Sequence, residues 1–127
     1  MFPKTFYGMT VNRGAIVLLQ GTLDLLILKT LSWGSAHGYA IARWIQQVTD
    51  DALQIEEGSL YPSLHRLEKR GLIRATWGLS ENKRRAKYYE LTARGRHALR
   101  AEASSWAAFV GAVAKVLASS DQPSWAK

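Results

Sequence analysis

Apolar side chains recur at helical spacing in two segments of the first half of the chain. The first helix is predicted from Gly21, with Thr22 as its N-cap and a buried face made of Leu23, Leu26, Ile27, Thr30 and Leu31. Gly34 and Ser35 interrupt this pattern. A second helix follows, and its apolar face comprises Tyr39, Ile41, Ala42, Ile45 and Val48. Asp50 and Asp51 end it, so the pattern predicts two core helices joined by a short turn.

A third helix is predicted within residues 53–71, with Ser59 as N-cap, Pro62 in the first turn and Gly71 at the C-cap. Its apolar face carries Leu60, Leu64 and Leu67. The opposite face is polar and cationic and carries Tyr61, Ser63, His65, Arg66, Lys69 and Arg70. A helix that is held in the core on one side and cationic on the other suits the major groove of DNA, so this segment is predicted to be a recognition helix.

Alternating apolar and polar residues over 72–77 and again over 86–91 predict two strands. The residues between them, 78–85, are rich in turn formers and cations, which predicts a β-hairpin with a basic tip. Three helices followed by such a hairpin form the winged variant of the helix-turn-helix. The fold class expected is therefore mainly α with a small β-hairpin.

A long final helix is predicted from about residue 93 to about 118, with Thr92 as its cap. Its apolar positions alternate in steps of four and three, as in a helix that packs on another helix: Leu99, Ala103, Trp106, Val110, Val113 and Leu117. At 1.5 Å per residue this helix is roughly 40 Å long, about the width of the winged domain. We therefore expect it to be a dimerisation helix, and we call these six positions the seam.

The patterns divide the chain into four parts. Residues 1–18 form an N-terminal extension that is either disordered or packed on the partner subunit, and residues 19–91 form the winged helix-turn-helix domain. Residues 92–119 form the dimerisation helix, and residues 120–127 lack periodicity and are expected to be a frayed tail.

Net charge is +7, and its location points to an anionic partner. Residues 1–58 carry four basic and five acidic side chains, residues 59–100 carry eleven and three, and residues 101–127 carry two and two. All of the excess positive charge thus lies in one segment, residues 59–100, which holds the predicted recognition helix, the hairpin and the start of the final helix. A solvated basic face without function is the alternative, and concentration in one structural unit argues against it.

The candidate DNA contacts come from these two elements. In the helix they are Ser59, Tyr61, Pro62, His65, Arg66 and Lys69, among which Arg66 could bond a guanine and Tyr61 a phosphate. In the hairpin they are Lys83, Arg84, Arg85 and Lys87, which lie close enough together to reach phosphates across a groove. For His65 the alternative is an ordinary surface histidine, and for Tyr61 a half-buried packing residue.

Trp106 has two interpretations. The first is that it belongs to an aromatic core, as the other tryptophans Trp33, Trp44 and Trp77 could in part. The second is that Trp106 and its dimer mate flank a cavity that stacks a flat ligand, because paired aromatic faces offer apolar area without demanding a particular partner.

Several function classes find no support in the sequence. There is no cysteine, which excludes disulfides, thiolate metal sites and thiol catalysis. The three histidines fall in separate helices away from carboxylates at ligand spacing, and Gly58–Ser59 lacks the second glycine of a nucleophile elbow. We therefore expect no enzyme, no metal and no cofactor. The longest apolar run is too short for a membrane span and no signal peptide is evident, so a cytoplasmic protein is expected.

Three motifs resemble the PadR-like transcriptional regulators, and the match runs from about Leu19 to Leu99. They are His37-Gly38-Tyr39, then Gly58-Ser59-Leu60-Tyr61-Pro62 with Leu64, Leu67 and Glu68 following, and then Tyr89-x-Leu91-Thr92-x-x-Gly95. Residues 1–18 lie largely outside the family pattern.

The resemblance implies a winged helix-turn-helix homodimer joined through a single C-terminal helix, as in the short class of the family. It also implies a repressor that reads a palindromic operator in double-stranded DNA and is released by a small-molecule effector. Effector pockets vary within the family, so no ligand site is carried over. Two alternatives remain: a drug-sensing dimer whose ligand sits near Trp106, and a protein-interaction module that does not bind DNA.

Overall fold

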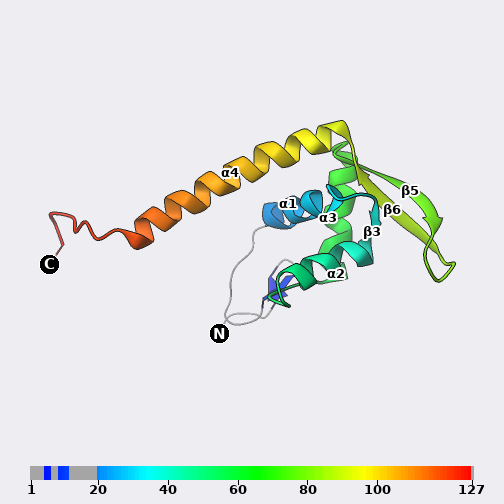
Figure 1. The fold of residues 1–127 in the computed structure, drawn as a ribbon, viewed down its shortest axis with the longest axis horizontal. Helices are drawn as coiled ribbons and strands as arrows, with labels where there is room; N and C mark the ends of the chain where they lie inside the picture. The colour runs from blue at the N-terminus through cyan, green and yellow to red at the C-terminus, as the bar shows by residue number, and fades with distance from the viewer. Residues whose placement is uncertain (1–4, 7–8, 12–19, 127) are drawn as a thin grey trace.

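The structure of this protein is a computed structural model, and it describes residues 5–6, 9–11 and 20–126 (Figure 1). In these ranges the elements are, in chain order, β1 (Thr5–Phe6), β2 (Met9–Val11), α1 (Gln20–Leu31), β3 (Ala36–His37), α2 (Gly38–Val48), β4 (Leu53–Ile55), α3 (Glu57–Lys69), β5 (Ile73–Leu79), β6 (Arg85–Leu91) and α4 (Ala93–Ala118). The predicted fold class, a mainly α winged helix-turn-helix with a long C-terminal helix, is confirmed.

The core lies where α1, α2 and α3 meet the root of the hairpin. It is built from the leucine and isoleucine positions that the helical spacing predicted, together with the inward residues of the sheet: Leu23, Ile27, Leu28, Leu31, Ile41, Ile45, Leu60, Leu64, Leu67, Leu72, Ile73, Tyr89 and Leu91. Burial of this apolar surface is the main source of stability in a domain of this size. It fixes one face of α3 and leaves the other face toward solvent.

The wing is an antiparallel sheet with the strand order β3-β6-β5. The hairpin register pairs Ile73 with Leu91 at the root and Leu79 with Arg85 near the tip. The short strand β3, which the sequence pattern did not reveal, pairs Ala36 with Tyr89. This pairing joins the start of α2 to the wing.

Three details of the helices differ from the predictions. Helix α3 begins at Glu57, after Glu56, so Ser59 is not its N-cap and Pro62 lies in the second turn. Helix α1 begins at Gln20, so Thr22 lies inside it as well. The helix dipole and the first-turn Glu57 favour the earlier start of α3, because a carboxylate near a helix N-terminus is stabilising.

The exposed face of α2 is larger than predicted. Tyr39 and Val48 are exposed, whereas Ile41 and Ile45 are fully buried. A hydrogen bond from the Ala40 amide to Nδ1 of His37, at 3.2 Å, caps the helix. At the other end Asp50 and Asp51 take positive φ angles of 50° and 66°, which stops the helix where the sequence predicted.

Helix α4 leaves the domain as a long arm (Figure 1). It begins at Ala93 with Thr92 as N-cap, as predicted, and the Thr92 hydroxyl accepts the Gly95 amide at 3.0 Å. Ala98 and Leu99 pack on the core, and every residue from 103 to 125 is exposed. None of the helices among residues 20–126 offers the continuous apolar length that a membrane span requires.

The N-terminal extension is described only in part. Its strands β1 and β2 pair with each other, and β2 pairs antiparallel with β4, which leads into α3. These five residues thus form a second small sheet together with β4 of the same subunit. The rest of the predicted extension, including its proposed disorder or packing on a partner, lies outside the described residues.

Candidate nucleic-acid interface

The solvent-facing side of α3 carries most of the predicted recognition residues. Tyr61, Pro62, His65 and Lys69 are exposed, and Ser59 is half-buried. Ser63 was predicted on this face but is buried, with 1% of its surface exposed. The face is narrower than predicted because Ser63 turns toward α1.

Arg66 has a different environment from the one predicted. Its guanidinium donates to Oδ1 of Asp24 on α1 at 3.2 Å and to the Ser63 hydroxyl at 2.8 Å. Asp24 is almost fully buried in the residue average, so the pair lies at the edge of the core. Arg66 therefore ties α3 to α1 in this structure, and we do not assign it to a base.

The wing tip presents three cations to solvent. Lys83, Arg84 and Arg85 are exposed, and the turn between the strands is closed by hydrogen bonds from the Lys83 amide to Ser80 O at 2.9 Å and from the Ser80 amide to Arg84 O at 2.8 Å. Lys83 has a φ of 57°, in the left-handed region that favours glycine. A lysine placed there, at the outermost point of the hairpin, sends its charge into solvent at a cost in backbone strain.

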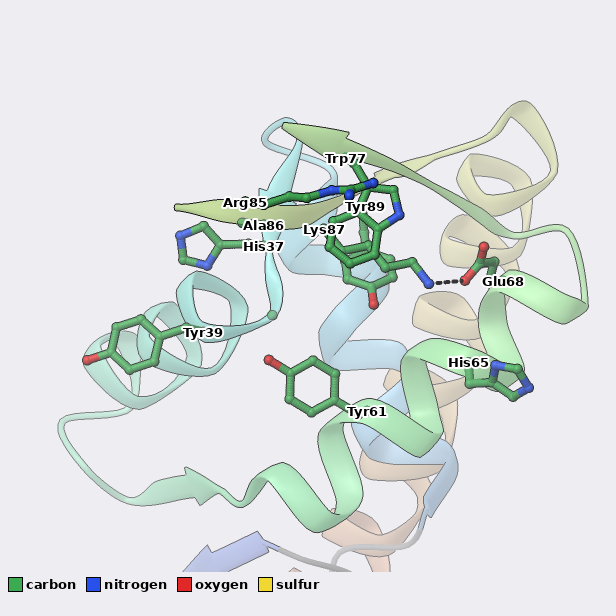
Figure 2. Close-up of a pocket in the computed structure, with 11 residues that line it drawn as sticks. His37, Tyr39, Tyr61, His65, Glu68, Trp77, Arg85, Ala86, Lys87 and Tyr89 are labelled. Atoms are coloured by element: carbon green, nitrogen blue, oxygen red, sulfur yellow. Dashed lines mark ion pairs between the residues drawn. The ribbon is translucent and has the colours of Figure 1, made fainter. Parts of the chain in front are cut away.

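A groove of about 690 Å³ separates α3 from the wing (Figure 2). Tyr61, His65 and Glu68 line it from α3, and His37, Gly38 and Tyr39 line it from the start of α2. The wing side is lined by Trp77, Arg85, Ala86, Lys87 and Tyr89. The groove therefore joins the predicted recognition residues to the predicted phosphate contacts in one continuous surface.

Close packing of Tyr61 against Gly38 forms the floor of this groove. A methyl group on Gly38 would lie 2.9 Å from the Tyr61 hydroxyl oxygen and 3.0 Å from its ring, which is too close. The absence of a side chain at Gly38 thus lets the tyrosine ring lie against the first turn of α2. Tyr61 is 45% exposed, so it packs on one side and faces the groove on the other.

Ring contacts and an ion pair hold the cations of the wing's inner face. The Arg85 guanidinium lies 4.6 Å from the centre of the Trp77 ring, and Lys87 Nζ lies 5.6 Å from that of Tyr89. Lys87 also forms an ion pair with Oε1 of Glu68 at 3.4 Å. Burial raises the pKa of the Tyr89 hydroxyl, and the Glu68 carboxylate and the Tyr61 side chain raise it further. Tyr89 is therefore neutral in ordinary buffers.

The sequence pattern predicted no interface role for Trp77, Glu68 or Gly38: Trp77 was considered only as a partly buried core residue, and the other two only as motif positions. Their contacts join α2, α3 and the wing, and such contacts between distant segments leave no periodic signal in the sequence. Trp77 could have been found from its place on the predicted strand, where it alternates onto the same face as Ala75.

Trp106 lies apart from this interface. It contacts Phe109, with ring centres 6.1 Å apart, and both line a mainly apolar cleft of about 430 Å³ between α4 and the first turns of α1. Gly21, Thr22 and Leu25 form the α1 side of the cleft. Trp106 is 43% exposed, so it is not a core residue of this subunit.

The possible metal ligands are spread apart in the part of the chain that the structure describes. No three histidine, aspartate or glutamate side chains come together there as a group that could hold an ion. The acidic groups near the interface instead contact basic side chains, as Asp24 and Glu68 do.

Comparison with known proteins decides the family. Residues 27–101 match the model of the transcriptional regulator PadR-like family. The chain belongs to the PadR-like family of transcriptional regulators. It is 33% identical over 90 residues to a Lysinibacillus sphaericus protein described as uncharacterized protein X, which covers 71% of this chain and 83% of that protein.

Solved structures of transcriptional regulators share the same fold. One from Clostridium thermocellum is 33% identical, with a TM-score of 0.69 over 76% of this chain and 93% of that one. A PadR-like transcriptional regulator from Bacillus cereus is 30% identical, with a TM-score of 0.69 over 80% of this chain and 96% of that one.

The motifs of the PadR-like family lie together in this structure. His37-Gly38-Tyr39 caps α2 and receives the ring of Tyr61, which belongs to the second motif. Tyr89, Leu91, Thr92 and Gly95 of the third motif join the wing to α4. Most of the motif residues thus hold α2, α3, the wing and α4 in place, and a smaller number of them line the groove.

Proposed function

We propose that this PadR-like regulator binds a palindromic operator as a homodimer and represses transcription until a small effector releases it. The observation that carries DNA binding is the groove between α3 and the wing, with exposed cations at its outer end. Tyr61, His65 and Lys69 would face the major groove, together with Ser59 and Pro62. Lys83, Arg84 and Arg85 would contact phosphates beside it.

DNA binding is tested by the salt dependence of affinity. Each cation that contacts a phosphate contributes a slope of about −0.9 to log K against log salt. Three wing cations in each of two subunits therefore predict a slope of about −5 or steeper for the dimer. Fluorescence anisotropy of a labelled duplex measures it, and absence of binding at low salt would favour the protein-interaction module instead.

Dimerisation is proposed through the exposed apolar face of α4. Of the six seam positions, Leu99 packs on the core of its own subunit, and the other five are exposed. Trp106, Val110 and Val113 are between 40% and 45% exposed, and Leu117 is 80% exposed. A contiguous apolar stripe of this kind marks an interaction surface, and a second copy of the same helix fits its alternating spacing.

Substitution of Val113 or Leu117 by glutamate is expected to give monomers, because each would bury a carboxylate in the seam. Sedimentation velocity measures the change. The matched control is Val116→Glu, since Val116 is 75% exposed on the same helix but lies outside the seam. If Val113→Glu and Leu117→Glu both stay dimeric while Val116→Glu dissociates, the seam lies on another face of α4.

A second candidate function, effector sensing, is favoured by the cleft beside Trp106. Its lining is mainly apolar and includes two aromatic rings, which suits a flat aromatic compound. In the proposed dimer this cleft lies next to the seam, so an occupant would act on the arrangement of the two subunits.

Quenching of tryptophan fluorescence by a panel of aromatic compounds tests this site. We expect saturable quenching in the wild type that is lost in Trp106→Phe and kept in Trp125→Phe, since Trp125 is 82% exposed in the tail. If no compound in a broad panel quenches the wild type, effector sensing at Trp106 is wrong. Repression itself is tested with a reporter that carries the selected operator: expression of the regulator should lower its output.

A further inference from the structure

Two of the interface cations predicted from the sequence are held by carboxylates. Asp24 holds Arg66 at the edge of the core, and Glu68 holds Lys87 inside the groove (Figure 2). The second pair joins α3 to the wing, the two elements that the proposed function brings to DNA. The Glu68 carboxylate therefore lies on the surface that is proposed to contact DNA phosphates, where a negative charge is unexpected.

Lys87 has two neighbours within the groove, the Glu68 carboxylate and the Tyr89 ring. Its register partner on β5 is Trp77, and alternation along β6 places Lys87 on the same face as Arg85 and Tyr89, toward α3. The Glu68 carboxylate lies 3.4 Å from Nζ, and the ring of buried Tyr89 lies 5.6 Å from it. Lys87 is only half-exposed, whereas Lys83, Arg84 and Arg85 are exposed.

The pair lies where the wing leaves the core. The hairpin root is anchored by Ile73, Leu91 and Tyr89, all buried. Beyond Lys87 the inner face of the hairpin loses this support, since Trp77 and Leu79 are 59% and 70% exposed. Both partners of the ion pair remain more than a third exposed, so it contributes little to stability. Its geometry, in contrast, places a carboxylate of the recognition helix beside a cation of the wing.

We propose that Glu68 is a positioning residue that sets DNA specificity by holding Lys87 away from phosphates. The inference rests on the proposed DNA binding. A carboxylate in the groove repels the backbone of any DNA, and the cation that it holds adds no sequence-independent attraction. Binding then depends on the contacts that α3 makes with the bases.

The central test is the salt slope of Lys87→Gln in two backgrounds, measured with full-length dimer and a short duplex of mixed sequence. In the wild type we expect almost no change of slope, because Lys87 is held by Glu68. In the Glu68→Gln background we expect the same substitution to reduce the slope by about 2 per dimer, since two released lysines then contact phosphates. A reduction of that size in the wild type, or none in either background, would overturn the proposal.

Specificity gives the second readout. Glu68→Gln should strengthen binding to mixed-sequence DNA by up to about 30-fold at ~0.15 M salt, and strengthen operator binding less, so that the ratio of the two falls. The exchanged pair Glu68→Lys with Lys87→Glu restores the contact and should return both slope and ratio toward the wild type. A ratio that is unchanged or higher in Glu68→Gln contradicts the proposal.

The same wing offers a matched control. Arg74 and Glu90 form a cross-strand ion pair at 2.6 Å on the outer face, away from α3. Glu90→Gln changes the net charge as Glu68→Gln does, and it should leave the slope and the specificity ratio unchanged. If the wild type binds no DNA at all, the proposed function fails first. The ion pair is then judged without DNA, by whether Glu68→Gln, unlike Glu90→Gln, shifts the NMR signals of the Lys87 side chain.

Discussion

Replacement of Gly95 by alanine is expected to remove about 3 to 5 kcal/mol of stability, a large fraction of the roughly 5 to 15 kcal/mol that a domain possesses. A Cβ at this buried position would collide with the carbonyl oxygen of Leu72, and backbone cannot yield as a flexible side chain can. That carbonyl accepts the Thr92 amide at 3.1 Å, and the Thr92 hydroxyl donates to Gly71 O at 2.6 Å. Relief of the clash would break this junction between the wing root and α4.

Urea unfolding followed by circular dichroism measures the loss in Gly95→Ala. The control is Gly58→Ala in the first turn of α3, because a Cβ at Gly58 meets nothing within 4 Å. Alanine is the better helix former, so the control should be as stable as the wild type or slightly more stable. Equal stability of Gly95→Ala and the wild type would mean that α4 does not approach Leu72 as described.

Removal of two wing cations is expected to have the largest effect on DNA binding. The double variant Arg84→Ala with Arg85→Ala removes four phosphate contacts per dimer, which should reduce the salt slope by about 3 to 4 and weaken binding by two to three orders of magnitude at ~0.15 M salt. Arg85 loses its contact with Trp77 as well, but both residues are exposed, so stability should hardly change.

Anisotropy titrations at several salt concentrations measure this effect. Lys29→Ala provides the control, since Lys29 is an exposed cation of α1 that also lies over a tryptophan ring, 5.1 Å from the centre of Trp33 in the turn after α1. It should leave slope and affinity unchanged. An unchanged slope in the Arg84 and Arg85 double variant would remove the wing from the DNA interface.

Elements whose signal is local could be predicted from the sequence. The alternation of Leu60, Leu64 and Leu67 placed the buried face of α3, and Thr92 located the start of α4 because a capping side chain bonds within three residues of itself. The positive φ of 76° at Gly71 likewise follows from a glycine just after a helix.

Contacts between distant segments could not be predicted in the same way. Arg66 is a residue type that often contacts bases, and its position on α3 favoured that role. Only the packing of α1 against α3 shows that Asp24, 42 residues away in the chain, lies beside it. Ser63 was misplaced for the same reason. Lys87 belongs to a cluster of four cations in the sequence, but its distance from Glu68 depends on how the wing folds over α3.

The start of α3 was misplaced for a local reason. Ser59 is a favourable N-cap and Pro62 favours a first turn, so both indicated a helix that begins about one turn too late. Helix formation instead extends back to Glu57, where β4 ends two residues earlier and its pairing with β2 fixes the direction of the chain. Tertiary pairing outweighed the capping preference.

The most direct test of the central claim is selection of bound sequences from a pool of random DNA duplexes with the full chain. The account predicts an enriched palindrome whose half-sites lie about one helical turn apart, roughly 10 bp, because two recognition helices related by a two-fold axis read equivalent grooves. The Val113→Glu variant should lose this enrichment if dimerisation uses the seam. Failure of the wild type to enrich any sequence, together with no DNA binding at low salt, would contradict the claim.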